Sequence, residues 1–199
     1  MALNRSTPEA GLFDGEQVNP DVPRPLAPWR QDLQRYGGAR ALLREQSLWA
    51  VLWHRVGHAV LNGGAPRPVK QLAMLPWWLV FRLIETVTGI SLPPSVTIGG
   101  GLRIWHFGGV FVHPAARIGA RCTLRQGVTI GNRHGGDDVP VIGDDVEFGA
   151  YAQVLGHVQI GDRARIGAMS VVLQDVPADA SAVGAPARVI ARSLSESRA

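Results

Sequence analysis

Residues 141–176 read VIGDDVEFGAYAQVLGHVQIGDRARIGAMSVVLQDV, and a bulky apolar residue recurs at every sixth position. The same period starts upstream, and Gly136 is its one interruption; the series is Val112, Ile118, Leu124, Ile130, Ile142, Phe148, Val154, Ile160, Ile166 and Val172. A period of six fits neither an α-helix nor an alternating strand. It is typical of a coil in which each flat side uses six residues.

Small residues lie four positions after nine of these ten apolar residues, and glycine often follows the apolar residue directly. The same step continues in an earlier frame at Ile98, Ile104 and Val110, with a two-residue shift before Val112. Three sides make a coil of about 18 residues, so the chain has room for roughly four coils. Each coil buries the open end of its neighbour. The sequence therefore predicts a mainly β fold built as a prism.

The segment 132–138, NRHGGDD, contains no residue suited to the interior of this prism. The six-residue frame before it agrees with the frame after it, so a whole repeat is predicted to turn outward as a loop over 131–141. Loops of this kind are frequent carriers of function.

The rest of the chain divides by composition and periodicity. Residues 1–28 are rich in proline, glycine and acidic residues without periodicity, and are predicted to form a flexible arm. Residues 29–89 are predicted to be helical, residues 90–190 to form the prism, and residues 191–199 to form a flexible tail.

Two amphipathic helices are expected in the helical region. Apolar residues over 42–60 recur at three- and four-residue steps, and a second helix is predicted over 68–88 with a kink or restart near Pro76. The paired Trp77 and Trp78 are suited to burial, to a subunit interface or to peripheral contact with a membrane; burial is favoured.

Composition excludes several classes of protein. A chain of 199 residues with 46% hydrophobic and 18% charged residues is typical of a globular protein. The formal charge of +4 comes from scattered arginines, so nucleic acid is not an expected partner. The single cysteine, Cys122, falls on a small inward position and is expected to pack there; with no secretory leader recognised, the cytoplasm is the expected location.

Several motifs resemble one enzyme family. Residues 166–190, IGAMSVVLQDVPADASAVGAPARVI, resemble the end of a hexapeptide-repeat acyltransferase. The motifs HRVGH at 54–58 and IWHFGG at 104–109 are similar to the serine acetyltransferase branch. RQGVTIGNR at 125–133 is similar to the colanic-acid type acetyltransferases of exopolysaccharide synthesis. The resemblance implies a left-handed parallel β-helix, acetyl-CoA as co-substrate, and a homotrimer, with a dimer of trimers through the N-terminal helices as an alternative.

The resemblance also implies a catalytic base. Transfer of an acetyl group to a hydroxyl needs a base for the hydroxyl proton, and histidine titrates near neutrality. His106 matches the family's catalytic histidine by position, whereas from the residues alone it could be a surface histidine at a corner. Trp105 beside it and His134 in the loop are predicted to bind the acceptor.

Small residues at the corners are expected to let the cofactor lie against the prism. The predicted cofactor-binding residues are Gly131, Gly149, Ala150, Gly167 and Ala168, with Arg188 for the CoA phosphates. His54 and His58 share a helix face, but further ligands of the required kind are missing from the sequence pattern, so no metal is expected.

Departures from the serine acetyltransferase pattern decide the predicted acceptor. Ser91 replaces the acid that orients the base, Trp105 replaces an aspartate, and Val139 replaces a serine-binding histidine, while the acid of the helical region has no clear counterpart after Asp32. Burying the charges of serine without partners costs several kcal/mol. The expected acceptor is therefore a hydroxyl of a sugar, polysaccharide precursor or small metabolite.

Two alternatives stay open at this point: an L-serine O-acetyltransferase of cysteine biosynthesis, and a catalytically degenerate scaffold protein. His106 would be oriented by a backbone carbonyl or by one of the acids Glu85, Asp137 and Asp138.

Overall fold

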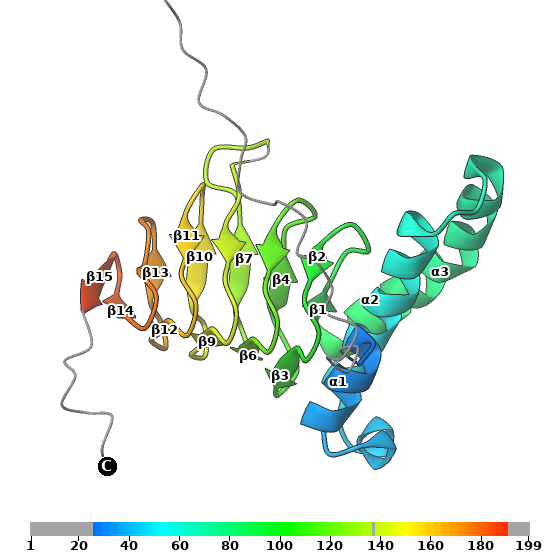
Figure 1. The fold of residues 1–199 in the computed structure, drawn as a ribbon, viewed down its shortest axis with the longest axis horizontal. Coiled ribbons are helices and arrows are strands. Elements are labelled where there is room, and N and C mark those ends of the chain that lie inside the picture. Colours follow the sequence, from blue (N-terminus) through cyan, green and yellow to red (C-terminus); the bar gives the residue numbers. More distant parts are fainter. Residues whose placement is uncertain (1–25, 137, 191–199) are drawn as a thin grey trace, which may run out of the picture.

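The computed structural model describes residues 26–136 and 138–190. A group of helices leads into a long coil of short strands and lies at one end of it (Figure 1). The helices are α1 (Pro28–Arg35), the 3₁₀ helix η1 (Ala39–Leu43), α2 (Gln46–Asn62) and α3 (Arg67–Thr88). The predicted tail and most of the predicted arm lie outside the described residues.

The strands form three sheets that make the flat sides of a prism. One sheet has the order β1 (Ile90–Ser91), β4 (Val110–Val112), β7 (Thr129–Gly131), β10 (Gln153–Leu155), β13 (Val171–Val172). The second has the order β2 (Thr97–Ile98), β5 (Arg117–Ile118), β8 (Val141–Ile142), β11 (Gln159–Ile160). The third has the order β3 (Arg103–Trp105), β6 (Thr123–Arg125), β9 (Glu147–Phe148), β12 (Arg165–Ile166), β14 (Ser181–Gly184), β15 (Ala187–Ile190).

Neighbouring strands pair in parallel, and β14 with β15 is antiparallel. The prism predicted from the six-residue period is confirmed, and so is the left-handed parallel β-helix implied by the resemblance. Its length exceeds the roughly four coils expected, because β1 precedes the first recognised repeat and β14–β15 follow the last.

The apolar series fills the centre of the prism. None of its ten members is more than 4% exposed. Burying each such side chain contributes roughly 1.5–3 kcal/mol, so the series makes a large contribution to stability. Cys122 packs among them, as predicted, and its burial raises the pKa of the thiol to about 12.

Helices α2 and α3 pack as a close pair. A Cβ on Gly57 would lie 2.4 Å from the Trp77 ring, so glycine is required where the helices touch. Trp53 and Trp77 each donate an indole N–H to the other's backbone carbonyl, at 3.1 and 3.0 Å. Of the two neighbouring tryptophans Trp77 is therefore buried, whereas Trp78 is 58% exposed. α3 is one helix with Pro76 inside it, so of the predicted kink or restart the restart is wrong. Within the described part of the chain, no helix is long and apolar enough to cross a bilayer.

A buried carboxylate fastens the helices to the first coil. Asp32 is fully buried and accepts hydrogen bonds from Arg55 Nε at 2.8 Å and Nη2 at 3.1 Å. The same carboxylate accepts the backbone N–H groups of Gly101 and Leu102, at 2.8 and 2.9 Å. All four donors converge on one side chain, which is therefore a structural anchor.

His54 gives the fold a predictable response to acid. It is 1% exposed, and its Nδ1 lies 3.0 Å from the carbonyl oxygen of Pro93. Burial, and then the charge of Arg55, lower its pKa to about 3. The unfolded chain binds a proton at this residue below about pH 6.5, whereas the folded chain resists it. Stability is therefore expected to fall as the pH drops from 6.5 towards 3, by up to ~1.4 kcal/mol per pH unit.

Urea unfolding of the wild type and of His54→Gln at several pH values checks this expectation. The variant removes the titrating group, so its free energy of unfolding should depend less on pH across that window. Equal pH slopes for the two proteins would contradict the assignment.

Candidate active site

His106 lies in the corner that follows β3. The buried Ile104 anchors the strand, Trp105 is 45% exposed, and His106 itself takes a left-handed backbone conformation with φ 63°. The turn leaves the imidazole exposed. It opens onto a cleft of about 330 Å³, here named the His106 cleft, lined by Arg44, Glu45, Gln46, Ser47, Trp105, His106 and Phe107.

A buried arginine holds two of the residues that line the His106 cleft. The Arg103 guanidinium lies 4.0 Å from the ring centre of Tyr36 and 4.0 Å from that of Trp105. Its Nη2 donates to Glu45 Oε1 at 2.8 Å. The stack fixes Trp105 and covers part of its ring, and the ion pair fixes the carboxylate of Glu45.

A second cleft, of about 470 Å³, lies along the third sheet. This arginine cleft is lined by Arg35, Trp105, Thr123, Arg125, Glu147, Phe148, Gly149, Arg165, Ile166, Gly167 and Ala168. Trp105 lines both clefts, so the cleft that contains the predicted base shares a lining residue with the cleft that contains three of the predicted cofactor residues, Gly149, Gly167 and Ala168.

The small corner residues also have a packing role. A Cβ on Gly149 would lie 2.4 Å from the backbone nitrogen of Ala168, and one on Gly167 would lie 2.7 Å from Val183 Cγ1. Both glycines are thus needed for neighbouring coils to approach. The same lack of side chains leaves the cleft floor open to a narrow ligand, so the two explanations are compatible.

Three cations of the arginine cleft were missed at the sequence level. Arg125 pairs in register with Trp105, and Arg165 pairs in register with Glu147. Arg125 and Arg165 are next in sequence to the inward-facing Leu124 and Ile166. The six-residue period therefore already predicted that both arginines face outward. Arg35 reaches the cleft from α1 and donates to the carbonyl of Gly101 at 2.8 Å.

Other predicted residues lie elsewhere. Gly131 ends β7 in a different sheet, and Ala150 accepts the backbone N–H of Met169 at 2.8 Å. Arg188 is exposed on β15, opposite Val183. His134 Nδ1 lies 3.4 Å from Asp138 Oδ2 in the loop between β7 and β8. None of these four lines either cleft, so the described residues do not join them to His106.

The acids considered for orienting His106 have other partners. Glu85 pairs with Arg82 at 2.5 Å, and Asp138 accepts the backbone N–H of His157 at 2.6 Å. Asp137 lies outside the described residues. The acid that the structure does place in the His106 cleft is Glu45, which sequence reasoning did not single out.

Comparisons with known proteins agree on one family. The bacterial transferase hexapeptide family (six repeats) matches residues 140–174. The serine acetyltransferase of Synechococcus elongatus is 37% identical over 167 residues, covering 83% of this chain and 65% of the relative. That of Helicobacter pylori is 36% identical over 153 residues, covering 76% of this chain and 85% of the relative.

Solved structures give the same result. A soybean serine acetyltransferase complexed with serine superposes with a TM-score of 0.70 at 34% identity, covering 82% of this chain and 68% of that one. A serine acetyltransferase in complex with CoA superposes with a TM-score of 0.67 at 29% identity, covering 81% and 68%. The chain spans less than two thirds of the length of the first relative, at 65%.

These findings contradict the predicted sugar acceptor and favour the serine alternative. The prediction relied on positions 91, 105 and 139, and it assigned Trp105 to acceptor binding. In the structure the Trp105 ring stacks on Arg103, and charged groups reach the cleft from the helical region instead. The predicted family, the acyltransferase class and the co-substrate acetyl-CoA agree with the relatives. The chain belongs to the serine acetyltransferase family of hexapeptide-repeat proteins.

Proposed function

We propose that this protein is an acetyl-CoA-dependent L-serine O-acetyltransferase. The observation that carries the proposal is that His106 lies in a cleft that shares Trp105 with the arginine cleft. A base for the acceptor and a positively charged groove for the donor therefore adjoin. Relatives of this name at 36–37% identity support the choice of serine.

The proposal gives each part of the site a role. Acetyl-CoA supplies an activated acetyl thioester, and Arg35, Arg125 and Arg165 would face its phosphates, since guanidinium pairs well with phosphate oxygens. His106 accepts the proton of the acceptor hydroxyl as the new C–O bond forms. The C–S bond of the thioester breaks, and the proton leaves with the CoA thiol.

Release of CoA thiol, followed with L-serine and with a set of sugars as acceptors, tests the proposal. Turnover of L-serine well above that of every sugar is the expected result. A sugar used in preference to serine would overturn it.

The exposed face of α3 supports an assembly through the helices. Its large apolar side chains are each at least 54% exposed: Val69, Leu72, Leu75, Trp78, Leu79, Leu83 and Val87. Large exposed apolar patches mark interaction sites. The helices lie at one end of the prism, so pairing there leaves the sides of the coil uncovered (Figure 1). The proposed state is a cytoplasmic homotrimer, two of which join through α3.

The double variant Leu79→Glu, Leu83→Glu is expected to halve the particle mass from six chains to three while serine turnover persists. Sedimentation measures the mass. An unchanged mass would exclude α3 as the joining surface.

A further inference from the structure

The turn that precedes α2 places charged groups beside the proposed base. Arg44 and Glu45 lie between η1 and α2, and both line the His106 cleft. Ser47 Oγ donates to the carbonyl of Ile104 at 2.9 Å, and the N–H of Ile104 donates to Tyr36 Oη at 3.0 Å. This turn is thus held against β3, the strand that leads into His106.

The carboxylate of Glu45 is held in place through one oxygen, and its other oxygen is available to accept a hydrogen bond. Its Oε1 accepts from Arg103, which is itself held between two aromatic rings. Among the described residues nothing donates a hydrogen bond to Oε2, and the side chain is 31% exposed. A rigid, partly used carboxylate at the wall of a cleft is suited to an ammonium group.

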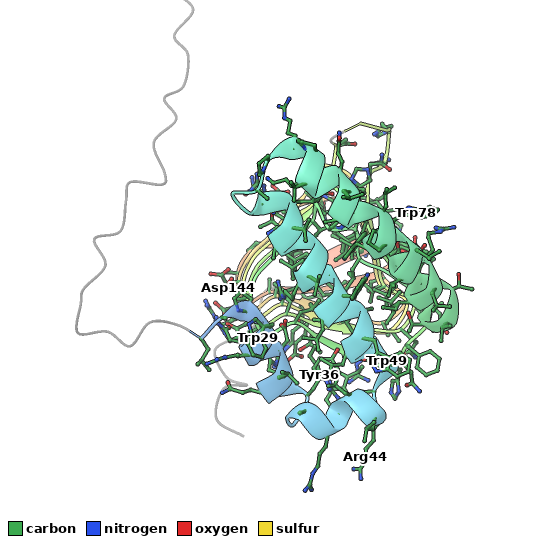
Figure 2. The ribbon with its side chains drawn as sticks, turned by 90° about the vertical axis from the view of Figure 1, so that its right-hand side faces the viewer. Trp29, Tyr36, Arg44, Trp49, Trp78 and Asp144 are labelled. Carbon is green, nitrogen blue, oxygen red and sulfur yellow. The ribbon has the colours of Figure 1, made fainter. Side chains whose placement is uncertain are left out.

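The N-terminus of α2 and Arg44 provide positive charge in the same cleft as the carboxylate of Glu45. Glu45 is the N-cap residue but makes no side-chain cap, and the first turn contains no acid. The backbone N–H groups of Gln46 and Ser47 have no acceptor among the described residues, and both residues line the cleft. Helix N-termini favour anions. Arg44 projects from the edge of the helical end (Figure 2) and forms no ion pair with a described residue.

We propose that Glu45 binds the ammonium of the acceptor, and that the N-terminus of α2 together with Arg44 binds its carboxylate. The acceptor class is then an α-amino acid whose side-chain hydroxyl faces His106. The inference rests on the proposed function and specifies its recognition residues. The polar groups lost at positions 105 and 139 are replaced in acceptor binding by groups from a different part of the chain.

Fragments of serine separate the two halves of the site. 3-Hydroxypropanoate lacks the ammonium, and ethanolamine lacks the carboxylate. Glu45→Gln is expected to raise KM for L-serine about 10- to 100-fold, as for loss of a hydrogen bond to a charged group. Its kcat/KM for 3-hydroxypropanoate should stay unchanged, and so should KM for acetyl-CoA.

The carboxylate half needs a change that spares the helix. Gln46 is the first residue of α2, and Glu45 before it is extended, so proline fits at position 46 while removing one N–H. Gln46→Pro and Arg44→Gln are each expected to raise KM for L-serine and for 3-hydroxypropanoate. Both variants should leave KM for ethanolamine unchanged. Where a fragment turns over too slowly, its inhibition constant against serine replaces kcat/KM.

Glu85→Gln is the matched control, because Glu85 pairs with Arg82 on α3 and lines neither cleft. Its kinetics should equal those of the wild type. If Glu45→Gln lowered kcat/KM equally for serine and both fragments, Glu45 would have a structural role. That result, or unchanged kinetics in Glu45→Gln, would overturn the inference but not the proposed function. A wild type that fails to acetylate serine would overturn the proposed function and the inference together.

Discussion

Replacing His106 with alanine is expected to lower kcat with L-serine by roughly 10²–10⁴-fold, as is typical when a general base is lost. The imidazole lines the cleft in which the proposed acceptor hydroxyl lies. KM for acetyl-CoA should change little, because His106 does not line the arginine cleft. Steady-state thiol release at saturating acetyl-CoA measures both constants.

His157→Ala is a suitable control for this prediction. His157 is exposed, its hydrogen bond to Asp138 uses the backbone nitrogen, and it lines neither cleft. Its kcat should match that of the wild type. Near-normal kcat in His106→Ala, or an equal loss in both variants, would remove His106 as the base.

The largest expected loss of stability comes from Asp32→Ala. The change leaves the guanidinium of Arg55 buried without its counter-ion, since the Arg55 side chain is 10% exposed and the Asp32 side chain fully buried. Breaking a buried pair in this way costs about 3–5 kcal/mol. The N–H groups of Gly101 and Leu102 lose their acceptor as well. Urea unfolding at neutral pH should show this loss.

An exposed ion pair serves as the control for the buried Asp32–Arg55 pair. Asp179 pairs with Arg163 at 2.7 Å, but the two side chains are 53% and 57% exposed. Exposed pairs of this kind contribute at most about 1 kcal/mol, so Asp179→Ala should change the free energy of unfolding little. Similar losses for Asp32→Ala and Asp179→Ala would show that Asp32 is not the anchor described.

The fold could be predicted because its signal is local. Each side of the prism uses six successive residues, so the buried face appears in the sequence as a spacing, and Gly136 marks where that spacing breaks. The choice of His106 as the proposed base also came from a local motif. What the six-residue period does not contain is which helix covers the end of the prism.

The composition of the His106 cleft could not be predicted for that reason. Glu45 and Arg103 meet although they are 58 positions apart, and Tyr36 stacks on the same guanidinium from a third element. Matching the sequence to the serine acetyltransferase motifs position by position revealed the loss of polar groups at Ser91 and Val139. It could not reveal charged groups that reach the cleft from another part of the chain. The sugar acceptor was inferred from that loss and was wrong.

The two ends of the coil limit its length. A stack of parallel strands ends in unpaired backbone groups, onto which another chain could add indefinitely. At the first coil, Arg55 donates to the carbonyls of Ile98 and Gly99, at 2.5 and 2.6 Å, and so occupies these acceptors. At the last coil, β15 runs opposite to β14, so a further parallel coil would meet a strand of the wrong direction. Both ends therefore oppose growth of the coil into a fibre.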